Sequence, residues 1–410
     1  MSSRVIPIAT APAAVAGRSA ATHLTVLPPL SLYIHFPWCV KKCPYCDFNS
    51  HEARGGVAGI PQDDYLAALI KDIESALPRV WGRRIVSVFI GGGTPSLFTT
   101  DALDALQAAI RSRLPLLPEA EITLEANPGT VEAGKFAAFR DSGINRLSLG
   151  IQSFNDRHLT ALGRIHSAAE ARGAVDLALR HFDNVNLDLM YALPQQTLAE
   201  ARSDIQTATS LGVAHVSAYH LTLEPNTPFH HAPPPLPDDD LAADMQEMVE
   251  STLADAGYQH YETSAFARPG RQCAHNLNYW LFGDYLGIGA GAHGKLSAPA
   301  AITREARRRH PRDYLEAAAR GEFVVEQRTV GGNELPFEFM MNALRLTDGF
   351  PLRLFQERTG LPLTAADGAL SQAQQRGLLA VDAATIRPTL QGRRFLNNLL
   401  ELFLAAEARG

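Results

Sequence analysis

Short apolar segments of strand length alternate with amphipathic segments of helical length from residue 31 to about residue 256. The apolar segments predict six β-strands, over Leu32–Phe36, Val86–Ile90, Glu121–Glu125, Asn145–Ile151, Asn184–Met190 and Ala214–Leu221. The segments that follow them predict helices over Asp63–Leu77, Asp101–Leu114, Val131–Ser142, Ala168–His181, Leu198–Leu211 and Asp240–Ala256. Strands that alternate with helices form parallel sheets, and six units suit a partial or full barrel. The sequence therefore predicts an α/β protein with its chemistry at the C-terminal ends of the strands.

The pattern changes after about residue 265, where we expect helices with fewer strands. Two short segments, Leu378–Val381 and Ala384–Pro388, predict a hairpin between helices, an arrangement that resembles a winged helix. No helix there is densely basic, so a structural role is favoured over DNA binding. We expect four parts: a disordered N-terminal extension at residues 1–28, a barrel domain at 29–265, a connecting segment at 266–325 and a smaller, mostly helical domain at 326–410.

Composition narrows the class of protein. The 410 residues carry a formal net charge of -6, which offers no basic surface to nucleic acid. The sequence has no run of 18 or more apolar residues, so we expect no transmembrane segment. The first 28 residues contain no acidic residue and only two arginines. A disordered tail on a cytoplasmic protein is favoured, and a mitochondrial transit peptide, which shares this composition, is the alternative.

Three of the four cysteines lie within eight residues, as Cys39-x3-Cys43-x2-Cys46, directly after the first predicted strand. Disulfide frameworks distribute their cysteines along a chain, so this grouping indicates a metal site in a reducing compartment. Three thiolates can hold three irons of a [4Fe-4S] cluster and leave the fourth iron open to another ligand. An amino acid whose amine and carboxylate are adjacent can chelate that iron.

Zinc is the alternative metal for the same loop. A fourth zinc ligand could come from His35, His51 or Cys273. Zinc sites, however, usually pair their cysteines as C-x2-C, and the sequence has no second pair. The spacing therefore favours the iron–sulfur cluster.

Polar residues that end later predicted strands are candidates for the rest of a cofactor site. The segment Gly91–Pro95 follows the second strand, where glycines let the backbone approach a ligand closely. Glu125, Gln152 and Asp188 end the third, fourth and fifth strands, and Arg164 follows the fourth. Burying such groups without partners costs free energy, so their shared place at one end of a barrel favours a site. Each of them alone could instead be structural.

The cysteine triplet after the first strand resembles the radical S-adenosylmethionine (radical SAM) superfamily. Further segments are similar to the oxygen-independent coproporphyrinogen III oxidase family, namely Tyr33–Cys39, Gly91–Pro95, Gly150–Phe154 and Asp188–Pro194. The resemblance covers roughly residues 30 to 400. It implies a partial (β/α)6 radical SAM barrel, similar to a TIM barrel, with a smaller and mostly helical C-terminal domain.

The resemblance also implies the cofactors and their ligands. Cys39, Cys43 and Cys46 would hold a [4Fe-4S] cluster, and S-adenosylmethionine would bind its open iron and be cleaved to a radical by one electron. The residues implied to bind S-adenosylmethionine are Tyr33, Tyr45, Gly92, Gly93, Thr94, Glu125, Gln152, Arg164 and Asp188.

Two departures place the chain nearer to the heme-chaperone branch of that family. Phe48 stands where true oxidases carry a further cysteine, and His275–Trp280 matches the H-N-x-x-Y-W motif of the branch. The branch implies a heme ligand, for which His275 is the candidate and Cys273 a second contact, and a heme-accepting partner such as a membrane-associated respiratory hemoprotein. A structural role for His275 at a junction between domains is equally open.

Two functions therefore stay open. The favoured one is a heme chaperone, and the alternative is an oxygen-independent coproporphyrinogen III oxidase, which converts its substrate to protoporphyrinogen IX. Whether the chain is an enzyme is left undecided. One further cluster could touch a porphyrin, because arginine forks suit propionates. A solvated helix face is nevertheless the favoured interpretation of these residues, which are Arg304, Arg307, Arg308, Arg309 and Arg312.

Overall fold

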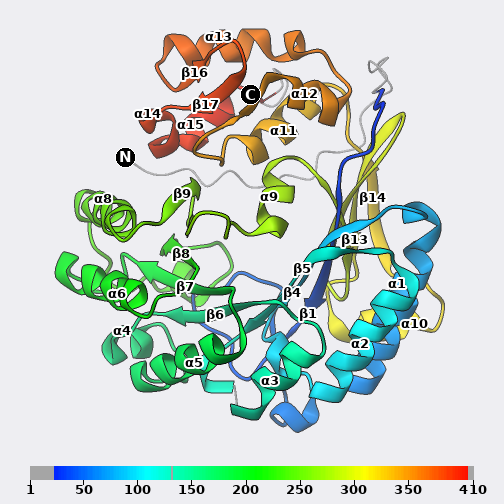
Figure 1. Ribbon diagram of the computed structural model, residues 1–410, viewed down its shortest axis with the longest axis vertical. Coiled ribbons are helices and arrows are strands. Elements are labelled where there is room, and N and C mark those ends of the chain that lie inside the picture. The colour runs from blue at the N-terminus through cyan, green and yellow to red at the C-terminus, as the bar shows by residue number, and fades with distance from the viewer. Residues whose placement is uncertain (1–22, 131–132, 405–410) are drawn as a thin grey trace.

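The computed structural model describes residues 23–130 and 133–404. Six parallel strands lie side by side in chain order and form the centre of one sheet. They are β1 (Leu30–Phe36), β4 (Ile85–Gly92), β5 (Leu116–Ala126), β6 (Arg146–Gln152), β7 (Val185–Tyr191) and β8 (His215–His220). All six predicted strands are confirmed, with ends that differ from the predicted ones by up to five residues. The sheet curves into the open barrel that Figure 1 shows.

The helices that connect these strands cover the outer face of the sheet (Figure 1). They are α1 (Gln62–Val80), α2 (Thr100–Arg113), α3 (Ala133–Asp141), α5 (Ala168–His181), α6 (Leu198–Ser210) and α8 (Asp239–Asp255). Each overlaps a predicted helix, although the first two residues of the helix predicted from Val131 lie outside the described part. Capping boxes start two of them, because Ser167 and Thr197 exchange hydrogen bonds with Glu170 and Glu200.

The stretch after residue 265 contains more strands than the sequence led us to expect. β10 (Ala265–Ala267) and β9 (Gln259–Glu262) extend the sheet beyond β8, and four strands extend it beyond β1. These are β11 (Asp284–Ile288), β12 (His293–Ala298), β13 (Ala301–Arg307) and β14 (Val324–Thr329). β11 is parallel to β1 and the rest of this extension is antiparallel. The sequence did not show the alternation of apolar and polar positions that marks a strand, because charged residues such as Lys295 and Glu305 are buried in these strands as ion pairs.

The arginine cluster is not a solvated helix face, and that expectation was wrong. Arg304 and Arg307 lie on β13, where Arg307 is only 1% exposed and donates to Glu305 Oε2 at 2.8 Å. Arg304 forms an ion pair with Glu338. Only Arg312 fits the expectation, because it lies exposed on α10 (Pro311–Ala318) beside Glu316. The guanidinium groups of Arg304, half-buried, and Arg307, buried, are thus engaged by carboxylates rather than held open for a propionate.

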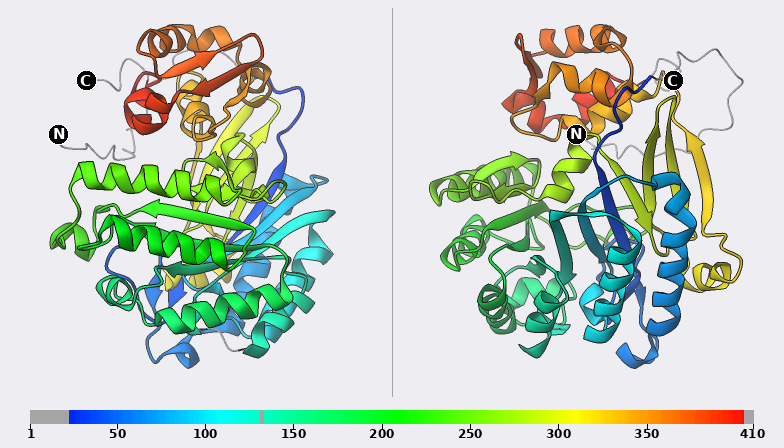
Figure 2. Two further views of the ribbon diagram at one scale, coloured as in Figure 1. Left: turned by 60° about the vertical axis from the view of Figure 1, so that its left-hand side comes forward. Right: turned by 45° about the vertical axis from the view of Figure 1, so that its right-hand side comes forward.

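The C-terminal part is mostly helical and has its own apolar core, which includes Phe339, Phe355 and Leu399. Its helices are α11 (Leu335–Ala343), α12 (Leu352–Thr359), α13 (Asp367–Gln375), α14 (Leu390–Arg394) and α15 (Leu396–Glu401). The predicted hairpin is confirmed as β16 (Leu379–Val381) and β17 (Thr385–Pro388), joined by β15 (Phe350–Pro351). Figure 2 shows this part above the barrel, at the end where β1 begins. None of the helices in the described residues is both long and apolar enough to cross a membrane.

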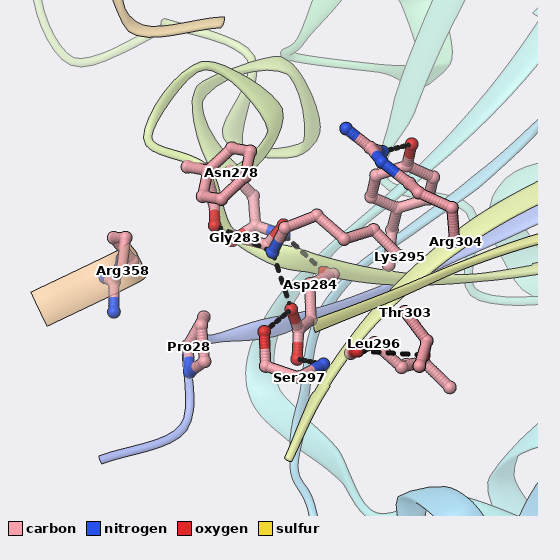
Figure 3. Close-up of polar contacts among 12 residues, drawn as sticks. Pro28, Asn278, Gly283, Asp284, Lys295, Leu296, Ser297, Thr303, Arg304 and Arg358 are labelled. Atoms are coloured by element: carbon pink, nitrogen blue, oxygen red, sulfur yellow. Dashed lines mark hydrogen bonds and ion pairs between the residues drawn. The ribbon is translucent and has the colours of Figure 1, made fainter. Parts of the chain in front are cut away.

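A buried ion network ties the sheet extension to the turn that follows α9 (Ala274–Trp280) (Figure 3). The Lys295 ammonium, 1% exposed, donates to Asp284 Oδ1 at 2.8 Å and to the carbonyls of Phe282 and Gly283. Arg83 and both donors of Ser297 complete the shell of Asp284. Burial alone would raise the pKa of Asp284, but Lys295 and Arg83 outweigh it and lower that pKa. The network holds Phe282 at a φ of 54°, a left-handed conformation that a non-glycine residue rarely adopts.

Candidate functional site

The three clustered cysteines lie in one loop at the C-terminal end of β1. The loop is closed by two short parallel strands, β2 (Trp38–Cys39) and β3 (His51–Glu52). Inside it, the Cys46 amide donates to the Cys43 carbonyl at 3.2 Å. All three thiols are free and partly exposed. The structure therefore places the three predicted cluster ligands in one partly buried loop.

Asn49 fastens this loop to the rest of the barrel. Its amide nitrogen donates to the Ala290 carbonyl at 2.9 Å and to the Arg309 carbonyl at 2.8 Å. The Asn49 carbonyl is also hydrogen-bonded to His35 Nε2 at 2.9 Å. The loop is thus held by the sheet extension as well as by β1, which sequence reasoning did not foresee.

The glycine segment after β4 lies directly against the start of the cysteine loop. The amides of Gly93 and Thr94 donate to the carbonyls of Phe36 and Trp38 at 2.7 and 2.8 Å. Gly92 has a φ of 112°, and a β-carbon there would lie 2.5 Å from the His35 ring. The segment requires glycine because the two backbones approach so closely. The Gly92 amide donates to Glu125 Oε2 at 3.0 Å.

A pocket opens between the cysteine loop and the strand ends, lined by Val40, Lys41, Cys43, Thr94, Asn127, Gly163, Arg164 and Ile165. Arg164 is its centre, because it donates to Cys43 Sγ at 3.4 Å, to the Gly150 carbonyl at 2.8 Å and to Asn127 Oδ1. Asn127 in turn donates to the Thr94 hydroxyl at 2.9 Å. The Arg164 Nε atom is buried and has no hydrogen-bond partner among the described residues. The pocket therefore presents an unused donor beside the cysteines.

Gln152 and the two predicted tyrosines border the same region. Gln152, the last residue of β6, has a left-handed φ of 67°, and its amide lies close to Gly150. Tyr33 hydrogen-bonds to His35 Nδ1 at 2.9 Å, and burial followed by the Glu125 carboxylate raises the pKa of Tyr33. Tyr45 lies between Cys43 and Arg164, and burial raises its pKa as well. All of these predicted residues gather at one end of the barrel.

The two predicted carboxylates lie deeper in the barrel. Asp188 does not end its strand, as the sequence led us to expect, but lies in the middle of β7 and faces inward. Its oxygens accept from Ser148 Oγ at 2.8 Å and from Asn186 Nδ2 at 3.0 Å. Burial, reinforced by Asp188, raises the pKa of Glu125 to about 8, so Glu125 is largely protonated at neutral pH. A protonated carboxyl at that place can donate a hydrogen bond as well as accept one.

The donor chemistry of this end fits an iron–sulfur cluster with S-adenosylmethionine. The three free cysteines lie in one loop, and Cys43 lines a pocket that also contains Arg164 with its buried, unpartnered Nε donor. Burial raises the pKa of Cys39 to about 11, so a metal has to displace its proton. Among the described residues, no three His, Cys, Asp or Glu side chains, the three cysteines included, converge as preformed ligands for a single metal ion.

His275 and Cys273 lie at the opposite end of the barrel. His275 Nδ1 is 3.0 Å from the Ser87 hydroxyl near the start of β4, whereas the cysteine loop follows the C-terminal end of β1. Ser87 is paired with Ser31, five residues before the end of β1, so His275 lies about 17 Å from the cysteine loop along the strands. The structure thus separates His275 from the cysteines, although its ring centroid is 6.4 Å from that of Tyr33, one of the predicted S-adenosylmethionine residues.

The His275 ring is enclosed. It is 2% exposed, stacks on Phe89 with a centroid distance of 5.0 Å and meets Tyr279 edge-on at 4.9 Å. Its Nε2 atom is buried without a hydrogen-bond partner among the described residues. Burial, followed by the nearby Arg146 charge, lowers the pKa of His275 to about 3, so the ring is neutral. Cys273 is also buried, and its Sγ donates to Glu121 Oε1 at 3.4 Å.

Sequence reasoning overlooked two charged residues that occupy the barrel between these ends. Arg146, 2% exposed on β6, faces Cys273, Glu121, Tyr261 and Asp188. The Glu121 carboxylate accepts from the backbone amides of Ala274 and His275 and so caps α9. A signal was present, because the charged Arg146 begins a mostly apolar strand. Its partner Glu121 was simply taken as the start of a strand.

The barrel, the glycine segment and the cysteine loop at the strand ends define a radical SAM domain. Residues 33–208 match the radical SAM superfamily, and residues 332–395 match the HemN C-terminal domain. The chain is 50% identical to the heme chaperone HemW of Haemophilus influenzae over 387 residues, which cover 93% of this chain and 99% of that protein. HemW of Escherichia coli is also 50% identical, over 92% of this chain and 99% of its own length. The chain therefore belongs to the HemW family of radical SAM proteins.

A solved structure agrees with this placement at the level of the fold. Coproporphyrinogen III oxidase (HemN) from Escherichia coli superposes with a TM-score of 0.77 over 92% of this chain and 90% of its own, at 24% sequence identity. A more distant relative is the bovine protein named radical S-adenosyl methionine domain-containing protein 1, mitochondrial, at 35% identity over 90% of this chain and 86% of its own. The predicted fold class, a radical SAM barrel with a mostly helical C-terminal part, is confirmed.

Proposed function

We propose that this protein is a heme chaperone, which binds a [4Fe-4S] cluster, S-adenosylmethionine and heme and passes the heme to an acceptor hemoprotein. The observation that carries the proposal is the 50% identity, over nearly the full length of both chains, to relatives named heme chaperone HemW. Phe48 supports it over the oxidase alternative, because an exposed phenylalanine stands where the oxidases carry a further cysteine.

The cysteine end of the barrel would hold the first two cofactors. Cys39, Cys43 and Cys46 would ligate the cluster, which supplies the electron that can cleave a bound sulfonium. Arg164, with its unused Nε donor, suits the carboxylate of S-adenosylmethionine. The other residues proposed to contact this ligand are Tyr33, Tyr45, Gly92, Gly93, Thr94, Glu125, Gln152 and Asp188.

The heme would bind at the other end, with His275 as the axial ligand. Ser87 holds Nδ1 and leaves Nε2 as the nitrogen that can face iron, an arrangement typical of metal-binding histidines. The ring is buried, so heme binding requires α9 to move and expose Nε2. Cys273 would be a second contact only after it leaves Glu121. The heme ligand would then lie about 17 Å from the cysteine loop along the strands, and Tyr33, whose ring centroid is 6.4 Å from that of His275, would link the two sites.

The partner and the compartment follow from the same proposal. We infer that the acceptor is a hemoprotein, with a membrane-associated respiratory hemoprotein as the specific candidate, and that the protein works in the cytoplasm. The mitochondrial bovine relative makes import the alternative. No role for nucleic acid is proposed, given the net charge of -6.

The test is an anaerobic heme titration of the reconstituted protein, followed by mixing with an apo-hemoprotein. We expect stoichiometric heme binding, transfer to the acceptor and no turnover of coproporphyrinogen III. His275→Ala should weaken heme binding, whereas His158→Ala, which alters another fully buried histidine, should not. Oxidase turnover, or heme binding that is unchanged in His275→Ala, would defeat the corresponding part of the proposal.

A further inference from the structure

A chain of hydrogen bonds runs through the barrel interior from Asp188 to the first turn of α9. The Asn186 amide bridges the Asp188 carboxylate and His215, with Oδ1 2.6 Å from His215 Nδ1. His215 Nε2 lies 2.8 Å from the Tyr261 hydroxyl. That hydroxyl accepts from the backbone amide of Cys273 at 3.3 Å. All of these links are among residues that are buried or half-buried, so water does not compete for them.

The orientation of the Asn186 amide sets the direction of the later links. Its Nδ2 donates to Asp188 and to Ser148 Oγ, and its Oδ1 accepts from Ser217 Oγ at 3.1 Å and faces His215. His215 Nδ1 must then carry the proton, and Nε2 must accept from the Tyr261 hydroxyl. Burial, followed by the Arg146 charge, lowers the pKa of His215, so the ring is neutral and has one N–H to place. The Tyr261 oxygen is left to accept the Cys273 amide.

The far end of the chain matters because it supplies one of the three side-chain hydrogen bonds that the described residues make to backbone amides at the start of α9. Cys273 is the N-cap residue but makes no capping bond with its side chain. Glu121 and Tyr261 are the two side chains that engage the backbone amides of Cys273, Ala274 and His275. Releasing the Tyr261 bond would loosen the turn that buries His275, which Glu121 and Ser87 also hold. Asn186 is also held by Ser148, which accepts from its Nδ2 at 2.8 Å, and by Ser217, which donates to its Oδ1 at 3.1 Å, so a ligand has to rearrange Asp188 and Ser148 together to move it.

We propose that His215 and Tyr261 are positioning residues that relay occupation of Asp188 to α9 through the hydrogen-bond chain, so that S-adenosylmethionine tightens heme binding. This inference rests on the proposed function, in which Asp188 contacts S-adenosylmethionine and His275 contacts heme. A ligand hydroxyl that donates to Asp188 competes with Asn186 and Ser148 for its oxygens. The displaced Asn186 no longer orders His215, Tyr261 turns away from Cys273, and α9 opens.

The experiment is a heme titration of the full chain with its oxidised cluster, with and without S-adenosylmethionine. In the wild type we expect S-adenosylmethionine to lower the heme Kd by about fivefold or more. Tyr261→Phe removes one hydroxyl. In the absence of S-adenosylmethionine, this variant should bind heme as tightly as the wild type does in its presence. Adding S-adenosylmethionine to the variant should not change its heme Kd. Tyr258→Phe is the matched control, because its buried hydroxyl donates to the Val213 carbonyl outside the chain of bonds, and it should keep the wild-type response.

The ratio of the two Kd values separates a relay from mere damage to the fold, which would weaken heme binding without abolishing the ratio. A wild type that binds both ligands with no change in heme Kd would overturn the relay and leave the chaperone function standing. A protein that binds neither ligand would refute the function itself. As an independent readout, ¹⁵N NMR of the apo-protein should show His215 protonated at Nδ1; an Nε2–H tautomer would contradict the assigned direction.

Discussion

Replacing Gly92 by alanine should damage the predicted S-adenosylmethionine site and the fold together. The φ of 112° at Gly92 lies in a region that residues with a β-carbon rarely adopt, at a cost of about 1–3 kcal/mol. The new methyl group would also meet the His35 ring, 2.5 Å from Cε1 and 2.6 Å from Nδ1. His35 cannot yield easily, because hydrogen bonds to Tyr33 and Asn49 hold both of its ring nitrogens.

The magnitude follows from these two effects. Forcing extra atoms into a packed site costs about 1–3 kcal/mol, so Gly92→Ala should lower the free energy of unfolding by about 2–6 kcal/mol. Relief by movement of the backbone would pull the Gly92 amide from Glu125 and shift the loop that carries the cysteines. We therefore expect weaker binding of S-adenosylmethionine as well as lower stability.

Urea unfolding followed by circular dichroism measures the stability, and equilibrium dialysis measures the ligand. Gly173→Ala is the matched control of opposite sign, because Gly173 lies inside α5 with open space where a β-carbon would be. That change should raise the free energy of unfolding by about 0.5–1 kcal/mol. If Gly92→Ala changes the free energy of unfolding by less than about 0.5 kcal/mol and leaves S-adenosylmethionine binding intact, the close contact between the Gly92 backbone and the His35 ring is contradicted.

Three further predictions concern buried ionisable side chains. Asp284→Asn leaves the Lys295 ammonium buried without its carboxylate and should cost about 3–5 kcal/mol in urea unfolding. Lys295→Met should cost less, because Asp284 keeps Arg83 and Ser297, and the reverse order would refute the network. Burial depresses the pKa of His275 to about 3 in the folded protein, so below about pH 6.5 the unfolded chain binds a proton that the folded chain does not. The free energy of unfolding should therefore fall by up to about 1.4 kcal/mol for each pH unit, and His275→Gln should remove this contribution. Arg164→Lys loses the fork whose Nη1 donates to Cys43 Sγ and whose Nη2 donates to Asn127 and Gly150, so the Kd for S-adenosylmethionine in dialysis should rise about tenfold. An unchanged Kd would remove Arg164 from the site.

Hydrophobic periodicity predicted the six central strands and the helices around them because each element buries one apolar face. It failed beyond β10, where strands place Lys295, Glu305 and Arg307 inside the protein as pairs. A pattern of apolar and polar positions cannot distinguish a buried ion pair from a solvated face. The partners of these residues are distant in sequence, and only the folded chain brings them together.

The candidate site divides in the same way. The cysteine loop and the glycine segment could be predicted, because a short spacing carries the chemistry. The contribution of His35 could not be predicted, because it depends on the close approach of two strand ends. Its ring fills the space beside Gly92. The separation of His275 from the cysteines was equally hidden, since the order of motifs along a chain does not tell which end of a barrel each one occupies.

The most direct measurement is the iron and sulfide content of the protein reconstituted without oxygen. The account predicts about four irons and four sulfides per chain in the wild type, and a large loss in Cys43→Ala. Cys273→Ala, which alters the cysteine outside the loop, should keep the wild-type content. A wild type that holds no iron, or a Cys43→Ala variant that holds as much as the wild type, would contradict the assignment of the cysteine loop as the cluster site.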